Sequence, residues 1–315
     1  MQRRPSVVVH CDWSKRAEKR WMMGAVRQGI RWLLTKPERV EDTSRFLEGL
    51  WSRCEEPGLF VGFDFPIGLP VRYAKRTCLT NFRHALREFG HGDWADWYVV
   101  AEHASQISVH RPFYPMRPGG RSQSQLLNAL NVQNKNDLLR RCEKKTRLRP
   151  AACMLFWTLG GNQVGKAAIS GWEELIVPNL DEVGLWPFDG PLNDLLQRFS
   201  VVVAETYPGE VYHQLQFPNK SKWSKRRPDG RQSVAGHLLS WLETRPAVTD
   251  ESLKAAIHQG FAEGPEGEDQ FDAMVGLLGM LDVIEGRREE GAPATPEITN
   301  WEGWILGQDN MESAA

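Results

Sequence analysis

Acidic residues stand at the ends of hydrophobic runs in this 315-residue chain, where side chains that face solvent would not be expected. Three of them directly follow short apolar runs, and two more come just before a longer one. The five acids are Asp12, Asp64, Glu205, Asp269 and Asp272. Burying a carboxylate is costly unless a cation or a metal ion accompanies it. The pattern therefore predicts that these acids form a functional site.

The apolar runs themselves predict a sheet. Short β-branched or alternating runs indicate five strands, at residues 7–12, 20–28, 29–34, 59–64 and 201–205. The first three are close enough in sequence to pair antiparallel, with a hairpin turn at Gln28 and Gly29. A helix predicted over 42–54 would then return the chain, so that the fourth strand lies parallel to the first. This order predicts an α/β fold with a mixed sheet.

The middle and the C-terminal end of the chain are harder to place on this sheet. Helical spacing occurs at 81–89, 136–142, 192–199, 233–242, 251–260 and 269–281. Residues 71–195 contain a loop rich in Pro and Gly and are predicted to be a helical and loop elaboration inserted after the fourth strand. Residues 301–306 either add a terminal strand or pack against the core. We expect one domain over residues 1–315, with a C-terminal tail at about 289–315.

The predicted strand order would bring the acids to one edge of the sheet. A strand that runs into an acid delivers that carboxylate to its carboxyl end, where open α/β sheets bind ligands. Asp269 and Asp272 are three residues apart, so they share one face of a helix, and a place in its first turn would favour acids. His10 is interpreted as a core residue that faces away from Asp12.

A divalent metal ion is the simplest counter-charge for carboxylates gathered in this way. Mg²⁺ and Mn²⁺ suit hard oxygen ligands, and pairs of such ions held by acids catalyse phosphoryl transfer. We therefore predict that Asp12, Asp64, Glu205, Asp269 and Asp272 bind Mg²⁺ or Mn²⁺. These acids would catalyse phosphodiester hydrolysis by a two-metal mechanism.

Positive charge gathers in two segments, 135–149 and 220–231, whereas 250–290 is acidic. Segregated charge of this kind can steer an anionic partner. In the second segment the predicted nucleic-acid contacts are Lys220, Lys222, Trp223, Lys225, Arg226, Arg227 and Arg231. Trp223 lies among cations and could stack on a base. The alternatives are that both segments are solvated surfaces and that Trp223 anchors a loop.

Cysteine usage and hydropathy exclude several classes of protein. The five cysteines are scattered without a C-x-x-C pair, which argues against a disulfide framework or a zinc ribbon. No run reaches the roughly 18 apolar residues that a membrane span needs. We therefore expect a cytoplasmic protein with no membrane partner. The Gly-rich segment 160–166 lacks the spacing and the Ser/Thr of a phosphate-binding loop and is predicted to be a turn.

Four segments together resemble a known family. They are residues 9–14, 61–70, 204–208 and 269–273. In this order they resemble the DUF429 family of predicted RNase H-like nucleases, marked by a first-strand Asp, an Ile-Asp-Ala-Pro-like motif leading into Gly-Leu-Pro, a Glu-x-Tyr-Pro motif and a closing Asp-x-x-Asp-Ala. The resemblance implies an RNase H-like fold: a five-stranded mixed sheet with its first three strands antiparallel, flanked by helices. It also implies that Asp12, Asp64, Glu205, and Asp269 or Asp272, bind the metal.

Two further functions are compatible with these features. A protein of the same fold with an inactive site would bind nucleic acid without cleaving it, which the basic segments favour. An actin-like phosphotransferase shares the core strand order, but it needs a nucleotide-binding loop that residues 160–166 match poorly. The leading prediction is a metal-dependent nuclease that acts on DNA or RNA.

Overall fold

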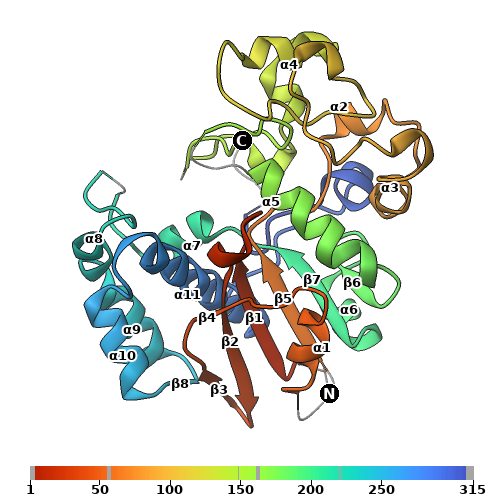
Figure 1. Cartoon of the computed structure of the whole chain (residues 1–315). Coiled ribbons are helices and arrows are strands. Elements are labelled where there is room, and N and C mark those ends of the chain that lie inside the picture. The colour runs from red at the N-terminus through yellow and green to blue at the C-terminus, as the bar shows by residue number, and fades with distance from the viewer. Residues whose placement is uncertain (1–3, 55–57, 148, 161–163, 220, 310–315) are drawn as a thin grey trace.

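A mixed β-sheet organises the protein (Figure 1). The structure, a computed structural model, describes residues 4–54, 58–147, 149–160, 164–219 and 221–309. Within these residues the sheet has eight strands in the order β6-β7-β5-β1-β2-β3-β8, and β4 pairs with β2. Helices flank the sheet, so the predicted α/β class with a mixed sheet is confirmed.

The strand pairings follow the predicted order. The strands are β1 (Val7–Asp12), β2 (Trp21–Gln28), β3 (Arg31–Leu34), β4 (Glu38–Arg39), β5 (Leu59–Phe63), β6 (Val183–Leu185), β7 (Val201–Glu205) and β8 (Ala247–Val248). β2 pairs antiparallel with β1 and β3, whereas β5 runs parallel to β1 and to β7. The hairpin turn falls at Gly29 and Ile30, one residue later than predicted. The predicted count of five strands is too low, because β4, β6 and β8 are too short to show an alternating pattern.

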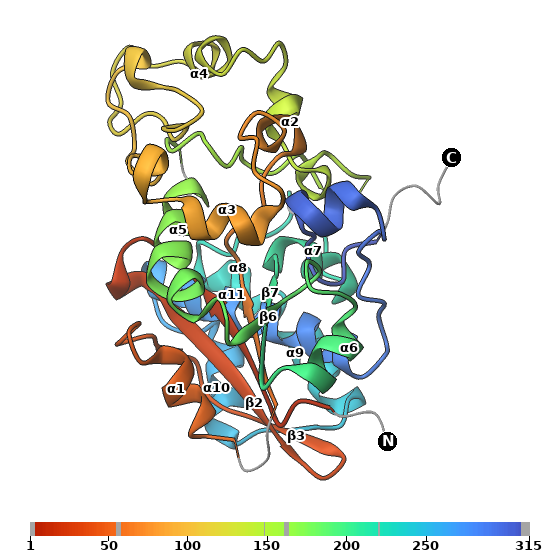
Figure 2. The same cartoon turned by 90° about the vertical axis from the view of Figure 1, so that its right-hand side faces the viewer.

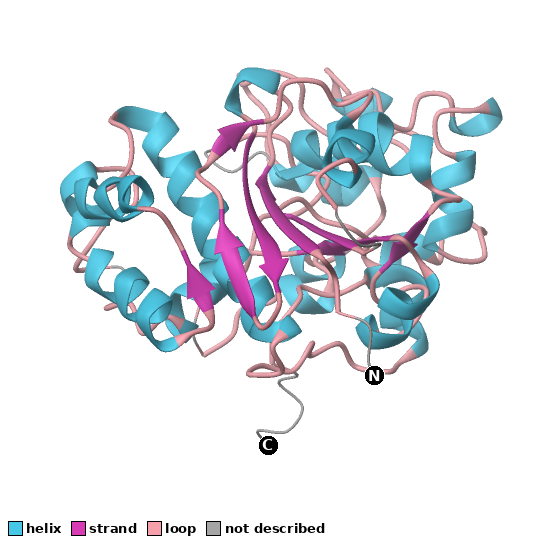
Figure 3. Cartoon of the chain, turned by 90° about the horizontal axis from the view of Figure 1, so that it is seen from below, coloured by secondary structure: helices cyan, strands magenta, loops and turns pink. Residues whose placement is uncertain are grey.

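Helices cover both faces of the sheet (Figure 2, Figure 3). They are α1 (Phe46–Trp51), α2 (Val71–Ala74), α3 (Phe82–Glu88), α4 (Gln123–Ala129), α5 (Val164–Gly171), α6 (Leu192–Arg198), α7 (Pro208–Gln214), α8 (Pro228–Gln232), α9 (Ala235–Thr244), α10 (Glu251–Gln259) and α11 (Gly264–Ile284). One apolar core joins the sheet to α1 and α5, and the other joins it to α6, α7, α9 and α11. The helix predicted over 136–142 is instead two short 3₁₀ turns, Lys135–Leu138 and Arg141–Glu143.

β1 sends alternate side chains into these two cores. Val7, Val9 and Cys11 face the α1 side, and Val8 faces the α11 side. His10 is fully buried, as predicted. It lies two residues before Asp12, however, so the two share a face of the strand, and the prediction that His10 faces away from Asp12 is wrong.

The longest helix, α11, crosses β1 and β2 and packs against α7. Its approach to β1 requires glycine at position 276, because a Cβ there would lie 2.2 Å from Nε2 of His10. The helix begins at Gly264 rather than at Asp269. Asp269 is therefore in its second turn, where the helix dipole that was expected to favour this acid has largely faded.

The elaboration after β5 lies beyond the carboxyl ends of β1 and β5, at the top of Figure 1. It contains α2 to α5 and has aromatic packing of its own, in which Phe89 stacks on Trp97 and Trp97 on Trp172. Of this region, α5 lines the cleft that also contains Asp12 and Asp64.

The C-terminal segment returns to the sheet. Ile305 forms an isolated parallel bridge with Glu205, and Trp304, Ile305 and Leu306 are buried. Residues 301–306 were expected either to add a terminal strand or to pack against the core. They pack against the core. No helix in the described part of the chain has both the length and the apolar character needed to cross a membrane.

Candidate active site

Asp12 and Asp64 lie side by side at the carboxyl ends of two neighbouring strands. Asp12 ends β1 and Asp64 directly follows β5, and these parallel strands pair Cys11 with Phe63. The backbone N–H of Trp13 donates to Oδ1 of Asp64 at 2.7 Å, which fixes that carboxyl group. The sequence prediction that parallel pairing brings these two acids together is confirmed.

The pair is electrostatically strained. Burial raises the pKa of Asp12 well above its ordinary value, and the charges of Asp64, Asp272 and Asp269 raise it further. Burial also raises the pKa of Asp64 to about 7, although the Trp13 amide and a hydrogen bond with Asp12 oppose that rise. Near neutral pH these two carboxyl groups therefore retain a proton that isolated carboxylates would have lost.

α11 contributes three more acids, Glu268, Asp269 and Asp272, which differ in their partners. Asp272 is buried and accepts a hydrogen bond from the Tyr212 hydroxyl at 2.6 Å. It also pairs with Nζ of Lys225, which lies 3.2 Å from Glu268 as well. Although burial alone would lower the pKa of Lys225, these acids raise it well above its ordinary value. Lys225 is therefore charged and committed to Asp272 and Glu268.

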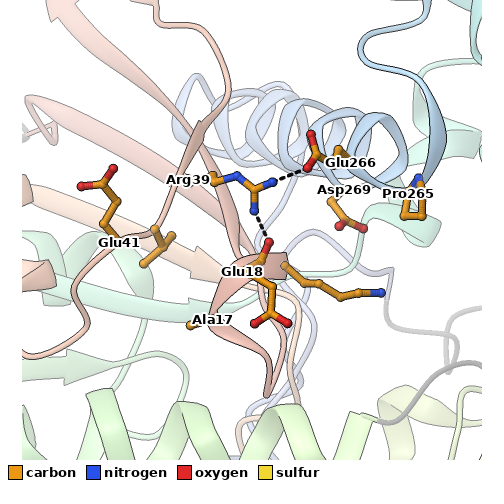
Figure 4. Close-up of a pocket in the computed structure, with 9 residues that line it drawn as sticks. Ala17, Glu18, Arg39, Glu41, Pro265, Glu266 and Asp269 are labelled. Atoms are coloured by element: carbon orange, nitrogen blue, oxygen red, sulfur yellow. Dashed lines mark hydrogen bonds and ion pairs between the residues drawn. The ribbon is translucent and has the colours of Figure 1, made fainter.

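Asp269 is more open than Asp272. Partial burial raises its pKa to about 6, and Lys19 acts in the opposite direction. Asp269 and Lys19 line two neighbouring cavities. One is the cleft that contains Asp12 and Asp64, and the other is a side cavity of about 610 Å³. Figure 4 shows Asp269 beside Arg39, which is bound to Glu266 and to the carbonyl oxygen of Glu18. Arg39 is thus committed to other groups and does not neutralise Asp269.

Asp12, Asp64 and the three acids of α11 line one cleft of about 700 Å³. Its wall also carries six basic residues: Lys15, Arg16, Lys19, Lys166, Lys225 and Arg226. The cleft therefore has carboxyl groups and basic side chains on the same wall. That combination suits an anionic substrate whose reacting centre is held by a cation bound to the acids.

Glu205 does not join the other acids. The register pairs Phe63 with Glu205, so Thr206 rather than Glu205 lies beside Asp64. Successive residues of a strand point to opposite faces, and Glu205 points to the face opposite Asp12. There both its carboxylate oxygens accept from Arg140 at 2.6 Å, and one also accepts from the Ile67 amide. The prediction that Glu205 lies with the other acids is wrong. Glu205 forms a buried ion pair away from the cleft.

The basic segment 220–231 contributes less to the cleft than predicted. Lys225 and Arg226 line it, whereas Lys222 and Arg227 are exposed outside it, and Arg227 lies 3.4 Å from Asp229. Arg231 is buried and donates to the carbonyl oxygens of Lys225, Gly260 and Ala262. Lys220 lies outside the described residues.

Trp223 is unable to stack on a base in this structure. Its ring is only 6% exposed and packs against Tyr212, Phe217 and Phe271. Its indole N–H donates to the carbonyl oxygen of Pro218 at 2.9 Å. The alternative interpretation, that this tryptophan anchors its loop, is the one that the structure favours.

Several residues of the cleft escaped the sequence prediction. Lys15, Arg16 and Lys19 follow Asp12 within seven residues, and this basic run directly after a predicted strand end was the signal that could have revealed them. Lys166 belongs to the Gly-rich segment that was predicted to be a turn, but residues 164–166 open α5 instead. Tyr212 shows no sequence signal beyond helical spacing.

The described residues do not form a complete metal site by themselves. No three of their His, Cys, Asp or Glu side chains are close enough together to hold a metal ion. Asp12 and Asp64 are a pair, Asp272 is occupied by Lys225, and Asp269 also opens into the side cavity. The oxygen donors nevertheless suit Mg²⁺ or Mn²⁺, which are often bound by one or two carboxylates together with water and substrate phosphates.

The raised pKa of Asp64 predicts how the metal-free protein responds to pH. Its ordinary pKa is 3.8 and its pKa in the folded protein is about 7, so between these values the folded state binds more protons than the unfolded state. The free energy of unfolding should therefore fall as pH rises through this range. Asp64→Asn keeps the acceptor for the Trp13 amide and should flatten the fall.

Urea denaturation in EDTA at about pH 5 and about pH 8 measures this effect. Asp194→Asn is the control, because Asp194 is exposed on α6 away from the cleft. If the wild type and Asp64→Asn lose the same free energy between the two pH values, Asp64 does not carry the raised pKa.

None of the protein-family models, curated proteins or solved structures with which the chain was compared matches it.

Proposed function

We propose that this protein is a metal-dependent hydrolase of phosphodiester bonds in nucleic acid, in which Asp12 and Asp64 hold Mg²⁺ or Mn²⁺. The observation that carries the proposal is their pairing at neighbouring strand ends, where neither carboxyl group forms an ion pair with a cation of the described residues. Of the other acids in the cleft, Asp272 and Glu268 pair with Lys225, and Asp269 forms no ion pair with a described residue. A divalent ion would supply the counter-charge that Asp12 and Asp64 lack.

A carboxylate pair is sufficient for such an ion. Mg²⁺ usually keeps several waters and takes only one or two protein carboxylates beside the phosphates of its substrate. When bound, the ion lowers the pKa of a water molecule and stabilises charge on the phosphoryl group. The second ion of a two-metal mechanism would need Asp269 as a ligand.

The other residues of the cleft have separate roles in this proposal. With a single ion bound, Asp269 is free of metal; with a pKa of about 6 it is mostly ionised at neutral pH and can accept a proton from an attacking water. Lys225 and Tyr212 hold Asp272 in one position through a salt bridge and a hydrogen bond. Asp272 then contributes negative charge beside Asp12 without binding the ion directly.

The strand order supports an RNase H-like core. β3, β2 and β1 are antiparallel neighbours, and β5 and β7 continue the sheet in parallel. We propose membership of the DUF429 family on this order and on the positions of Asp12 and Asp64. The Glu of the Glu-x-Tyr-Pro motif is not part of the proposed metal site, because Arg140 occupies Glu205.

A cleavage panel tests the function. Single- and double-stranded DNA, single-stranded RNA and an RNA–DNA hybrid are incubated with the protein and Mg²⁺ or Mn²⁺, and parallel reactions contain EDTA. We expect cleavage of at least one substrate with metal and none with EDTA. Binding without cleavage of any substrate would favour the inactive nucleic-acid-binding alternative. Thermal stabilisation by ATP without cleavage would favour a phosphotransferase.

A further inference from the structure

Two lysines on the wall of the cleft lie near enough for the charge of one to act on the other, and neither forms an ion pair with a described acid. Lys15 follows β1, three residues after Asp12, and Lys166 lies in the first turn of α5. Both line the cleft that contains the acids. Neither forms an ion pair or a side-chain hydrogen bond with any residue that the structure describes. Partial burial lowers the pKa of Lys166, and the charge of Lys15 lowers it further.

Two of the other four cations of the cleft form ion pairs, whereas Lys19 and Arg226 form none with a described residue. Arg16 pairs with Glu18 at 2.6 Å, and Lys225 pairs with Asp272 and Glu268. These cations have their charge balanced by the protein. Lys15 and Lys166 form no such ion pair with a described residue, although the charge of Lys15 opposes the rise that burial and Glu174 cause in the pKa of Glu173. Both lysines line the cleft and are within reach of a ligand there.

The protein holds the two lysine-bearing segments together. The indole N–H of Trp13 donates to the Ser170 hydroxyl at 3.1 Å, which ties the loop after β1 to α5. The Arg20 guanidinium lies 4.2 Å from the centre of the Trp13 ring and pairs with Glu174 at 2.6 Å. α5 itself packs closely, because a Cβ at Gly165 would lie 2.1 Å from the carbonyl oxygen of Leu155. The repulsion between the ammonium groups is therefore maintained by packing, and an anion between them would relieve it.

The geometry points to a phosphate-binding subsite formed by Lys15 and Lys166, which holds a backbone phosphate adjacent to the one cleaved at Asp12 and Asp64. An ammonium group is a strongly hydrated point charge that binds phosphate oxygens without demanding one geometry, and contacts to phosphate position nucleic acid without reading its sequence. The subsite rests on the proposed function, since it assigns the position of the substrate backbone in that cleft. It also predicts that recognition by these two residues is independent of base sequence.

The test measures binding separately from cleavage. In an Asp12→Asn background, fluorescence anisotropy follows binding of a short labelled single-stranded DNA in Mg²⁺ buffer at increasing KCl. Lys15→Gln with Lys166→Gln should weaken binding about tenfold or more at low salt. It should also reduce the slope of log K against log salt by about 0.7, since each neutralised phosphate of a single strand contributes about 0.7.

The matched control is Lys36→Gln with Lys75→Gln, which removes the same charge from two exposed positions outside the cleft. Its affinity and salt slope should stay within about twofold of the parent protein. Equal losses in the two double variants, or no loss in the Lys15 and Lys166 variant, would overturn the subsite. Absence of measurable binding by the parent protein would overturn it as well.

The outcome is separable from that of the cleavage panel. If the parent binds through the two lysines and the wild type cleaves nothing, the nuclease proposal fails and the subsite remains. If the wild type cleaves and the lysine variant binds like the parent, only the subsite fails. If both hold, the lysine changes in the wild-type background should raise KM more than they lower kcat.

Discussion

Replacement of Arg140 by leucine is expected to lower the free energy of unfolding by about 3–5 kcal/mol. The guanidinium of Arg140 is fully buried and pairs with Glu205 at 2.6 Å and Glu143 at 2.9 Å. It also donates to the carbonyl oxygens of Ile67 and Glu302. Without it, two buried carboxylates lose their counter-charge. Urea denaturation measures the loss, and Arg140→Lys, which keeps the charge but not the paired geometry, should lose less.

The control for this prediction is an exposed ion pair. Arg45 pairs with Glu48 at 2.9 Å, but both side chains are largely exposed. Arg45→Leu should therefore change the free energy of unfolding by less than about 1 kcal/mol. If Arg140→Leu costs no more than Arg45→Leu, the buried pair does not stabilise the fold and its assignment as structural is wrong.

Asp12→Asn is expected to reduce metal-dependent cleavage by on the order of 10³-fold or more, because it removes the charge of one of two proposed metal ligands. The amide has nearly the same shape, so the fold should persist. Its stability at neutral pH should not fall, since burial and three neighbouring acids disfavour the charge that it removes. Initial cleavage rates on the best substrate of the panel measure the effect.

Asp194→Asn is the matched control, as the same change at an exposed position of α6. It should cleave at the wild-type rate. Cleavage by Asp12→Asn at an undiminished rate would assign the activity to another site or to a contaminant.

The sequence sufficed to place Asp12 and Asp64 because their positions depend on one pairing. Two apolar runs joined by a helix predict parallel neighbours, and an acid after each run then lies at the same edge. Glu205 follows an equally clear strand, yet its side chain points to the other face. A shift of one residue in register reverses the face of every side chain, and apolar runs that are buried on both faces contain no alternation from which that register could be read.

Partners remote in sequence set the remaining differences. Arg140 comes from the middle of the chain, where helical spacing predicted a helix and the structure has 3₁₀ turns. No local pattern shows that it reaches Glu205, 65 residues away. Likewise, Trp223 among cations has the composition of a base-stacking residue, but Phe217 and Phe271 enclose its ring. Such outcomes depend on tertiary packing, which single-chain patterns do not encode.

Calorimetric titration of the metal-free protein with Mn²⁺ at about pH 8, where the proposed ligands are most fully ionised, tests the central claim most directly. We predict binding to the wild type that is lost in Asp12→Asn and Asp64→Asn and retained in folded Glu205→Gln. Absence of binding to the wild type, or binding that survives both aspartate changes, would contradict the proposal that these two strand-end carboxyl groups hold a metal ion.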